Sequence, residues 1–462
     1  MTDTDRRVPP AMSARQRVAL ALLLTASFTL AVDFSVLTVA LPAIGSDVGL
    51  PLEHLQWIAT SFALCSAGCT LLFGRVADLV GRRRVFLAGV ALLGVASLAG
   101  GVATSPGVLL AARVAQGLAT AAVTPAALSL LTTSFPEGPL RDRALGLNGA
   151  LMAAGFTTGA VLGGVLTDLL SWRWAFFLNV PVAVAVLLLA PAVLPADGPE
   201  RRARLDVLGA LTVTSGLLAV VFGLTTAGRT SWTDPAAFGS LLAGAVLLAW
   251  FWLVERRAAD PLVPVAVLGR RTVGWGNVVG LLAFATETSL VFLLTLYLQD
   301  VLGYSPLAAG LSFAVLGVGT VLGGAVGPRL IAVLGTRSTL VLGSGVQAVA
   351  TAPLVLLGHE PGWIALLLVA TFAGGVGNLV AIVGFVVTAT SGLPDREQGL
   401  ATGLATTSQQ IGITTGIPVM SAVVTARLDG GVLSGITAAV GVNAALCALT
   451  AVLAAVFLRP GR

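Results

Sequence analysis

The sequence contains no lysine, two histidines and three cysteines, and charged residues make up only 10% of its 462 residues. Cys65, Cys69 and Cys447 fall in apolar segments and have neither metal-ligand spacing nor the pattern of a disulfide framework. His54 and His359 are far apart in the chain, so no zinc site or acid–base site is indicated. We therefore expect no metal, no cofactor and no enzyme activity.

Hydrophobic residues, in contrast, make up 56% of the chain, and the mean hydropathy is +0.96. Both values lie outside the range of soluble globular domains. About fourteen apolar segments approach the roughly 20 residues that a helix needs to cross a bilayer. The sequence therefore predicts an all-α polytopic membrane protein without a soluble domain. The expected spans are 18–41, 55–73, 85–103, 108–131, 144–170, 174–194, 207–227, 237–254, 273–298, 307–327, 339–357, 362–388, 400–424 and 435–458.

The net charge of +5 is distributed in short loops and forms no extended basic patch, so nucleic acid is not an expected partner. With both termini inside, 22 arginines fall in cytoplasmic loops and three in external loops, and Arg113 remains within a span. Arginine-rich loops stay on the cytoplasmic side. We attribute the absence of lysine to GC-rich codon usage, and we expect a multi-pass protein of a bacterial plasma membrane with both termini cytoplasmic.

A basic loop at residues 74–86 separates the second and third expected spans. It reads Gly-Arg-Val-Ala-Asp-Leu-Val-Gly-Arg-Arg-Arg-Val-Phe and is, at the least, a solvated positive-inside loop. Its spacing resembles the loop between helices 2 and 3 of major facilitator superfamily transporters. The residues that carry this resemblance are Gly74, Arg75, Asp78, Gly81, Arg82 and Arg83.

The two halves of the chain echo each other. Residues 74–83 align with residues 328–337, so that Arg329, Gly335 and Arg337 match Arg75, Gly81 and Arg83, although Ala332 stands in the place of Asp78. Parallel repeats of this kind build the major facilitator fold, with a substrate site at mid-membrane between the halves. The expected organisation is a tail (1–17), a six-helix half (18–194), a linker with two extra transmembrane helices (195–272), a second six-helix half (273–458) and a tail (459–462).

Three ionisable residues fall well inside the expected spans: Asp33, Arg113 and Glu287. A charge within the membrane is costly, so each is a candidate functional residue. If Asp33 faces Arg113, a conformational change that alters their separation can switch proton affinity; the alternative is a static buried ion pair. Glu287 can recognise a cationic substrate, carry a second proton or hydrogen-bond a neighbouring threonine.

Uncharged polar residues at the same depth are further candidates for the lining of a cavity. Gln116, Gln347 and Asn378 belong to this group, although hydrogen bonds between helices are the more common explanation for such residues.

The expected fifth helix carries a pattern of small residues, Gly155, Gly159, Gly163 and Gly164. Such spacing allows close helix packing. It also resembles the antiporter motif of this helix in major facilitator exporters, with Ala160 in place of the proline.

Three further stretches are similar to the 14-span drug:proton antiporters of this superfamily. They are residues 172–181, residues 302–311 and the first-helix stretch 33–42, in which Ser35 and Thr38 replace the usual threonine and asparagine. Ser35 and Thr38 are therefore candidates for the cavity lining.

The resemblance implies a monomeric secondary transporter that exports a small hydrophobic or cationic drug or antibiotic in exchange for protons, by alternating access. It also implies that Asp33 is the coupling carboxylate and Arg113 its partner, and that Asp78 and the arginines of its loop latch one state against the chain near Gly399. The alternatives are a nutrient or metabolite symporter or facilitator of the same fold and, less favoured, a membrane sensor or enzyme.

Overall fold

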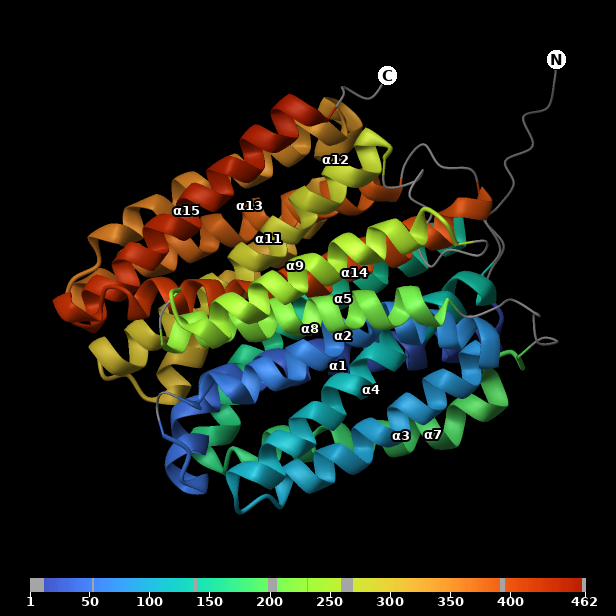
Figure 1. Ribbon diagram of the computed structural model, residues 1–462, viewed down its shortest axis with the longest axis horizontal. Coiled ribbons are helices and arrows are strands. Elements are labelled where there is room, and N and C mark those ends of the chain that lie inside the picture. The colour runs from blue at the N-terminus through green and yellow to red at the C-terminus, as the bar shows by residue number, and fades with distance from the viewer. Residues whose placement is uncertain are drawn as a thin grey trace.

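The chain folds as a bundle of long α-helices that run in roughly one common direction (Figure 1). The computed structural model describes residues 12–51, 54–135, 139–197, 206–230, 232–258, 269–390 and 395–458. Within these ranges the regular elements are all helical and no strand occurs. The predicted all-α class is confirmed, whereas most of the two predicted tails and part of the predicted linker lie outside the described residues.

The order of the helices follows the predicted spans. The first half contains α1 (Ala14–Val48), α2 (Gln56–Val80), α3 (Arg82–Gly101), α4 (Pro106–Ser134), α5 (Pro139–Leu169), α6 (Arg173–Phe177) and α7 (Asn179–Val193). Two helices follow it, α8 (Val207–Arg229) and α9 (Pro235–Glu255). The second half contains α11 (Arg271–Leu296), η2 (Tyr297–Val301), α12 (Pro306–Thr351), η3 (Ala352–Leu356), η4 (Pro361–Trp363), α13 (Ile364–Thr390), α14 (Asp395–Thr425), η5 (Leu428–Gly430) and α15 (Val432–Phe457).

Local sequence explains where several helices begin. Ser13 forms a capping box with Gln16 at the start of α1, and the carboxylate of Asp206 accepts a backbone N–H at the start of α8. Asp234 and Ser305 cap α9 and α12, and each is followed by a proline at the first helical position. Proline is well tolerated there, because that N–H would have no partner inside the helix.

Twelve of the described helical stretches are long and apolar enough to span a membrane. One of them, Pro306–Leu356, has 51 residues because α12 joins two helices at Gly335, whose φ of 78° and ψ of 164° are not helical. The more polar α14 has 31 residues and is not among the twelve. If α12 is counted as two helices and α14 is added, the total is fourteen; the fourteen membrane spans stay a prediction.

The two halves lie side by side, and α8 lies between them (Figure 1). This helix packs against α2 of the first half and α14 of the second, while α9 packs against the outer side of α8. Only 17% of the most apolar 18-residue stretch of α9 is buried inside the protein. Helix α8 therefore bridges the two halves, and α9 lies on the outside of the bundle.

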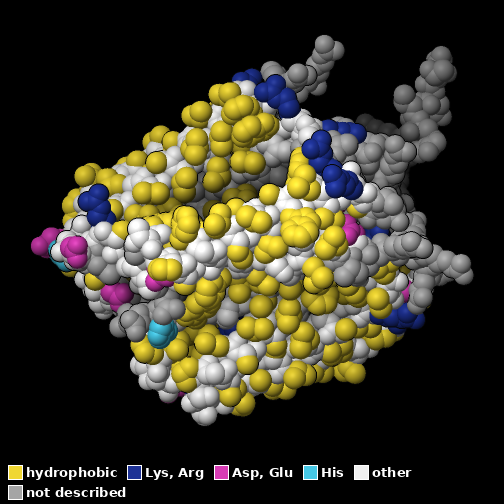
Figure 2. Space-filling view, viewed as in Figure 1, with side chains coloured by type: hydrophobic (Ala, Val, Ile, Leu, Met, Phe, Trp, Pro, Cys, Tyr) yellow, Lys and Arg dark blue, Asp and Glu magenta, His cyan; other side chains and the backbone are white. Residues whose placement is uncertain are grey.

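The surface has the composition of a membrane protein. Figure 2 shows hydrophobic side chains over the middle of one face, with arginines mostly at the end where α1 begins and α15 ends. Val95, Leu188 and Val349 are at least 66% exposed, which is favourable in lipid and unfavourable in water. The protein is therefore a multi-pass membrane protein, whereas its orientation stays a prediction.

The basic loop between α2 and α3 is held by the segment that follows α7. Asp197 accepts hydrogen bonds from the backbone N–H groups of Arg83 (2.8 Å) and Arg84 (3.2 Å), and thereby caps α3. The side chain of Arg83 donates to the carbonyl oxygen of Pro191 at 2.5 Å. Gly81 has a φ of 119° and a ψ of 130°, and a methyl group there would overlap the Asp197 carboxylate. Glycine is therefore needed at position 81 for two reasons: the positive φ is unfavourable for other residues, and Asp197 leaves no room for a side chain.

The second half repeats this geometry at the aligned positions. Gly335 again has a positive φ, and Arg337 donates to the carbonyl oxygen of Ala455 near the end of α15. In both halves, therefore, a glycine turn is followed by an arginine that binds the end of the last helix of its own half.

The latch predicted for Asp78 takes a different form in this structure. Asp78 pairs with Arg82 of its own loop, at 3.0 Å, and both side chains are partly exposed. The side chains around Gly399 are not among those that the structure describes. A latch between the halves at this position stays a prediction.

The small residues of α5 pack against α1. Methyl groups at Gly155, Gly159 and Gly163 would each overlap backbone atoms of α1, at residues 28, 32 and 36 respectively. Gly164 instead lies against the carbonyl of Pro306, at the start of α12 in the other half. This helix thus joins the two halves through backbone-to-backbone contact, as small-residue spacing permits.

An ion pair and its hydrogen bonds connect α1 to α6 beyond Leu41, where the apolar part of α1 ends. We call these contacts of Asp47 with Trp172 and Arg173 the Asp47 clasp. Asp47 pairs with Arg173 and accepts a hydrogen bond from the Trp172 indole N–H at 2.9 Å. Arg173 also donates to the carbonyl of Ala103 at 3.2 Å. The hydrogen bonds from Arg173 and Trp172 lower the pKa of Asp47 below its ordinary value of 3.8.

We predict that Gly81→Ala destabilises the protein by about 1–3 kcal/mol, because alanine is strained at this φ and its methyl group displaces the Asp197 cap. Thermal unfolding of the purified protein in detergent measures the effect. Gly303→Ala is the matched control, since Gly303 also has a positive φ, of 68°, but has no atom within 4 Å of an added methyl group. Equal melting temperatures for the two variants would show that the cap contributes nothing.

The Asp47 clasp should make stability depend on pH. Because the folded-state pKa of Asp47 is depressed, the stabilisation is complete above pH 3.8 and is lost as the pH falls below that value. We predict that the melting temperature of the wild type exceeds that of Asp47→Asn at pH 6, and that the difference shrinks below pH 4. A difference that stays constant down to pH 3 would contradict the assignment.

Candidate functional site

Asp33 and Arg113 face each other across the first half and form a buried ion pair. Arg113 Nη1 on α4 lies 3.1 Å from Asp33 Oδ2 on α1, and both residues are only 1% exposed. Arg113 Nε also donates to the carbonyl of Ile58 on α2, at 2.9 Å. The guanidinium thus connects three helices of this half.

Amide side chains complete the environment of the carboxylate. Gln116 donates to Asp33 Oδ1 at 3.0 Å and to the Ser97 hydroxyl at 2.9 Å, and it accepts a hydrogen bond from Arg113 at 2.9 Å. Asn179 on α7 donates to Asp33 Oδ1 and, at 3.1 Å, to Ser97. We call these five residues the charged network. Its members come from α1, α3, α4 and α7, and its ionised pair is neutral overall.

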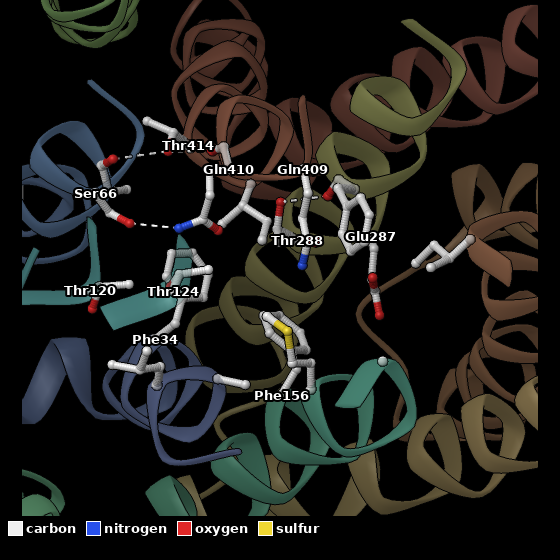
Figure 3. Close-up of a pocket in the computed structure, with 18 of the residues that line it drawn as sticks. Phe34, Ser66, Thr120, Thr124, Phe156, Glu287, Thr288, Gln409, Gln410 and Thr414 are labelled. Carbon is white, nitrogen blue, oxygen red and sulfur yellow. Dashed lines mark hydrogen bonds between the residues drawn. The ribbon is translucent and has the colours of Figure 1, made fainter. Parts of the chain in front are cut away.

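A central cavity of about 110 Å³ lies between the two halves (Figure 3). Its walls come from α1, α2, α4 and α5 on one side and from α11, α13 and α14 on the other. Most of the lining is apolar, including Phe34, Phe62, Phe156 and Phe284. Its polar lining residues are Ser66, Thr120, Thr124, Glu287, Thr288, Gln409, Gln410 and Thr414.

Phe62 lies between this cavity and the charged network. Its ring lines the cavity, and its centroid is 4.2 Å from the guanidinium carbon of Arg113. Phe34 contacts the same ring at 5.8 Å between centroids, and it stacks on Phe156 at 6.0 Å. Arg113 and Asp33 do not themselves line the cavity. Phe34 and Phe62 thus form an aromatic wall of the cavity, and the Phe62 ring lies between the cavity and the ion pair, in contact with Arg113.

Glu287 is the acidic residue in the described lining of the cavity. It lies on α11, and Figure 3 shows it on the opposite side of the cavity from Phe34 and Thr120. Among the described residues, no hydrogen bond or ion pair to its carboxylate is formed. The predicted hydrogen bond to a neighbouring threonine is therefore not seen: Thr286 and Thr288 bond to carbonyls of their own helix.

A second polar network occupies the corresponding place in the second half. Gln347 donates to the Thr286 hydroxyl at 3.3 Å, and Asn378 donates to Gln347 at 3.3 Å. Asn443 donates to the Thr286 carbonyl at 2.9 Å and to Ser289 at 3.0 Å. We call these five residues the neutral network. It draws on α11, α12, α13 and α15, and none of its side chains is charged.

Five of the six residues proposed for the cavity lining lie outside the described lining of the central cavity in this conformation. Ser35 is fully buried and donates to carbonyls of its own helix, beneath Gly159 of α5. Thr38 is 5% exposed and, like Ser35, is not in the lining, while Gln116 belongs to the charged network. Ser35 lies on the face of α1 that packs against α5, and in this conformation none of these three residues belongs to the described lining of the cavity. Gln347 and Asn378 line a smaller pocket between α11, α12 and α13.

The sequence analysis did not find Ser97, Asn179 or Phe62 as site residues. Asn179 is an amide inside an apolar span, and that signal was present in the sequence. Phe62 carries no such signal, because an aromatic residue in a span is ordinary.

The halves meet in this conformation at the end remote from the start of α1. Gln299 donates to the Val39 carbonyl at 3.2 Å, and Gln410 and Thr414 of α14 bond to Ser66 and to the Ala63 carbonyl of α2, at 2.6 and 3.0 Å. Together with the contact of Gly164 with Pro306, these bonds join the two halves in this conformation.

Two helical halves that enclose a central cavity within a membrane define a transporter of small molecules. A family model described as the Major Facilitator Superfamily matches residues 23–417 and 277–462. The chain belongs to this superfamily, whose members are transporters and not enzymes.

The curated relatives agree with this assignment. The chain is 39% identical to a protein named cephamycin export protein CmcT from Amycolatopsis lactamdurans, over 89% of this chain and 86% of that protein. It is 36% identical to puromycin resistance protein pur8 from Streptomyces alboniger, over 95% and 90% of the two chains. The crystal structure of the human organic anion transporter MFSD10 (TETRAN) has the same fold, with a TM-score of 0.63, 17% identity and coverage of 95% of this chain and 99% of that one.

Proposed function

We propose that this protein exports a small hydrophobic or cationic drug or antibiotic in exchange for protons. The observation that carries the proposal is the ion pair of Asp33 and Arg113, sealed from water beside an apolar cavity and separated from it by the Phe62 ring. The names of the relatives, an exporter of one antibiotic and a resistance protein for another, support the substrate class.

The cavity favours lipophilic substrates over anionic ones. Its lining is rich in phenylalanine and aliphatic side chains, and its described lining contains one carboxylate and no arginine. An importer of an anionic nutrient would need fixed positive charge there. Arg113 does not supply it, because its guanidinium is buried behind Phe62 and bound to Asp33.

Proton binding at Asp33 must be tied to a change of conformation. In the observed state three side chains donate hydrogen bonds to the carboxylate, which favours its ionised form. Protonation here would leave Arg113 as an uncompensated buried cation, at a cost of several kcal/mol. A state that separates the pair therefore binds a proton, and the state shown here releases it.

Phe62 connects this proton site to the substrate. Its ring lines the cavity, where a ligand would contact it, and also contacts the Arg113 guanidinium. Displacement of the ring alters a cation–π contact worth about 0.5–2 kcal/mol. It thereby changes the free-energy difference between the states in which Asp33 and Arg113 are paired and separated. Rocking of the halves about the central cavity then exposes substrate and proton sites alternately.

The proposal predicts that Asp33→Asn abolishes substrate-dependent proton movement while the protein remains inserted and folded. We would measure it in proteoliposomes that contain a pH-sensitive dye, with an imposed pH gradient and a panel of lipophilic dyes and antibiotics. Asp47→Asn is the matched control, because it neutralises a carboxylate of the same helix outside the apolar span. Wild-type proton movement in Asp33→Asn would reject the coupling role.

Phe62→Leu should keep an apolar side chain at the cavity wall but remove the ring above Arg113. We predict that fewer protons move per substrate than in the wild type, with export only partly reduced. Phe284→Leu is the control, since Phe284 also lines the cavity but contacts Phe385 in the second half and not Arg113. If the two variants show the same proton-to-substrate ratio, Phe62 has no coupling role.

A further inference from the structure

A groove of about 480 Å³ lies at the surface of the protein, between the start of α8 and the end of α9. Leu208, Trp250 and Leu253 line it, and each of the three is 52–54% exposed. Val254 and Arg257 extend the α9 wall, so residues 250, 253, 254 and 257 form one face at helical spacing. The groove therefore has an apolar wall that leads to an arginine just beyond the last turn of α9.

The two helices that form this groove pack closely along their length. A methyl group at Gly223 of α8 would overlap Leu241 of α9, at 2.8 Å, and one at Gly244 of α9 would overlap Val220 of α8, at 2.6 Å. Each helix has a stretch of 21 residues that is long and apolar enough to span a membrane. The groove lies at one end of both stretches, where hydrocarbon meets lipid headgroups and where tryptophan is enriched.

Arg257 presents a positive charge to this groove. Its side chain is exposed and forms no hydrogen bond or ion pair with another described residue. Arg83 and Arg173, in contrast, bind a carbonyl oxygen and a carboxylate respectively. The acidic residue of the lining, Asp206, is engaged by α8: its Oδ1 accepts the Gly209 N–H at 2.8 Å, and its Oδ2 is buried. The start of α8 offsets that negative charge, so a ligand in the groove meets the guanidinium as the accessible ion.

We propose that this groove binds an anionic phospholipid of the membrane leaflet at this end of the bundle. The Arg257 guanidinium donates parallel hydrogen bonds to the phosphodiester, and an acyl chain lies along Leu208, Trp250 and Leu253. The face from Trp250 to Arg257 extends about 10 Å at the helical rise per residue, so headgroup and chain contact it together. A water-soluble phosphate compound matches the arginine alone, whereas a lipid matches both the arginine and the apolar wall.

The lipid site is separate from the central cavity, with which it shares no described lining residue, and it does not depend on the proposed function. Helix α8 packs against α2 of the first half and α14 of the second. A lipid held between α8 and α9 therefore contacts the helix that bridges the halves. The composition of the membrane acts on this bridge and leaves the substrate cavity unchanged.

Native mass spectrometry of the full-length protein in detergent tests the site, with phosphatidylglycerol and phosphatidylcholine of identical acyl chains as probes. Both lipids have a phosphodiester, but phosphatidylglycerol alone carries a net negative charge. We expect the wild type to bind the first phosphatidylglycerol about fivefold more tightly than phosphatidylcholine, the ratio that one arginine at a membrane surface supplies. A third probe, glycerophosphoglycerol, has the same headgroup without acyl chains and should not displace the lipid.

Two pairs of variants locate the binding. Arg257→Gln should remove the preference for phosphatidylglycerol. Arg256→Gln is its matched control and should keep the preference, since Arg256 is the adjacent exposed arginine but lies outside the described lining. Leu208→Gln should weaken both lipids severalfold, because it makes the acyl wall polar. Leu211→Gln is the control for it, at a leucine of the same helix that is 58% exposed and outside the described lining.

The proposal is overturned if the wild type binds the two lipids equally, if Arg257→Gln binds as Arg256→Gln does, or if Leu208→Gln binds as Leu211→Gln does. Displacement of the lipid by glycerophosphoglycerol would also overturn it, because the site would then take a soluble phosphate compound. These measurements involve no transport, so their outcome is independent of drug:proton exchange.

Discussion

The burial of one ion pair constrains the organisation of the first half. A carboxylate or a guanidinium alone at this depth would be strongly unfavourable, so Asp33 and Arg113 stay together in this conformation. Their hydrogen bonds to Gln116, Asn179 and the Ile58 carbonyl draw α1, α2, α4 and α7 into one unit. Close packing of α5 glycines on α1 adds a fifth helix to this unit.

The second half uses the same arrangement of helices without the charge. Thr286, Gln347, Asn378 and Asn443 hold α11, α12, α13 and α15 together through neutral hydrogen bonds. Glu287 follows Thr286 directly and faces the cavity, so the acidic residue of this half is available to a ligand. In our proposal the half that holds the charged pair couples transport to protons, while the acidic residue of the other half faces the substrate cavity.

The sequence analysis succeeded where a residue type is rare in its surroundings. Three ionisable residues within apolar spans pointed to Asp33, Arg113 and Glu287, and repeated loop spacing pointed to Gly81 and Gly335, which adopt the same kind of turn. It could not tell in which direction a side chain points, as for Ser35 and Thr38, which lie outside the described cavity lining in this conformation. A span is apolar on the faces toward lipid and toward protein alike, so periodicity does not tell which face meets the cavity. For the same reason Phe62 could not be distinguished from a packing residue.

The most direct test of the central claim is the number of protons released when substrate binds to the purified protein in weakly buffered solution, followed with a pH indicator. Our account predicts release of about one proton per bound substrate from the wild type and none from Asp33→Asn, because binding favours the state in which Asp33 pairs with Arg113. Undiminished release from Asp33→Asn, or binding to the wild type without release near the pH at which Asp33 titrates, would contradict it.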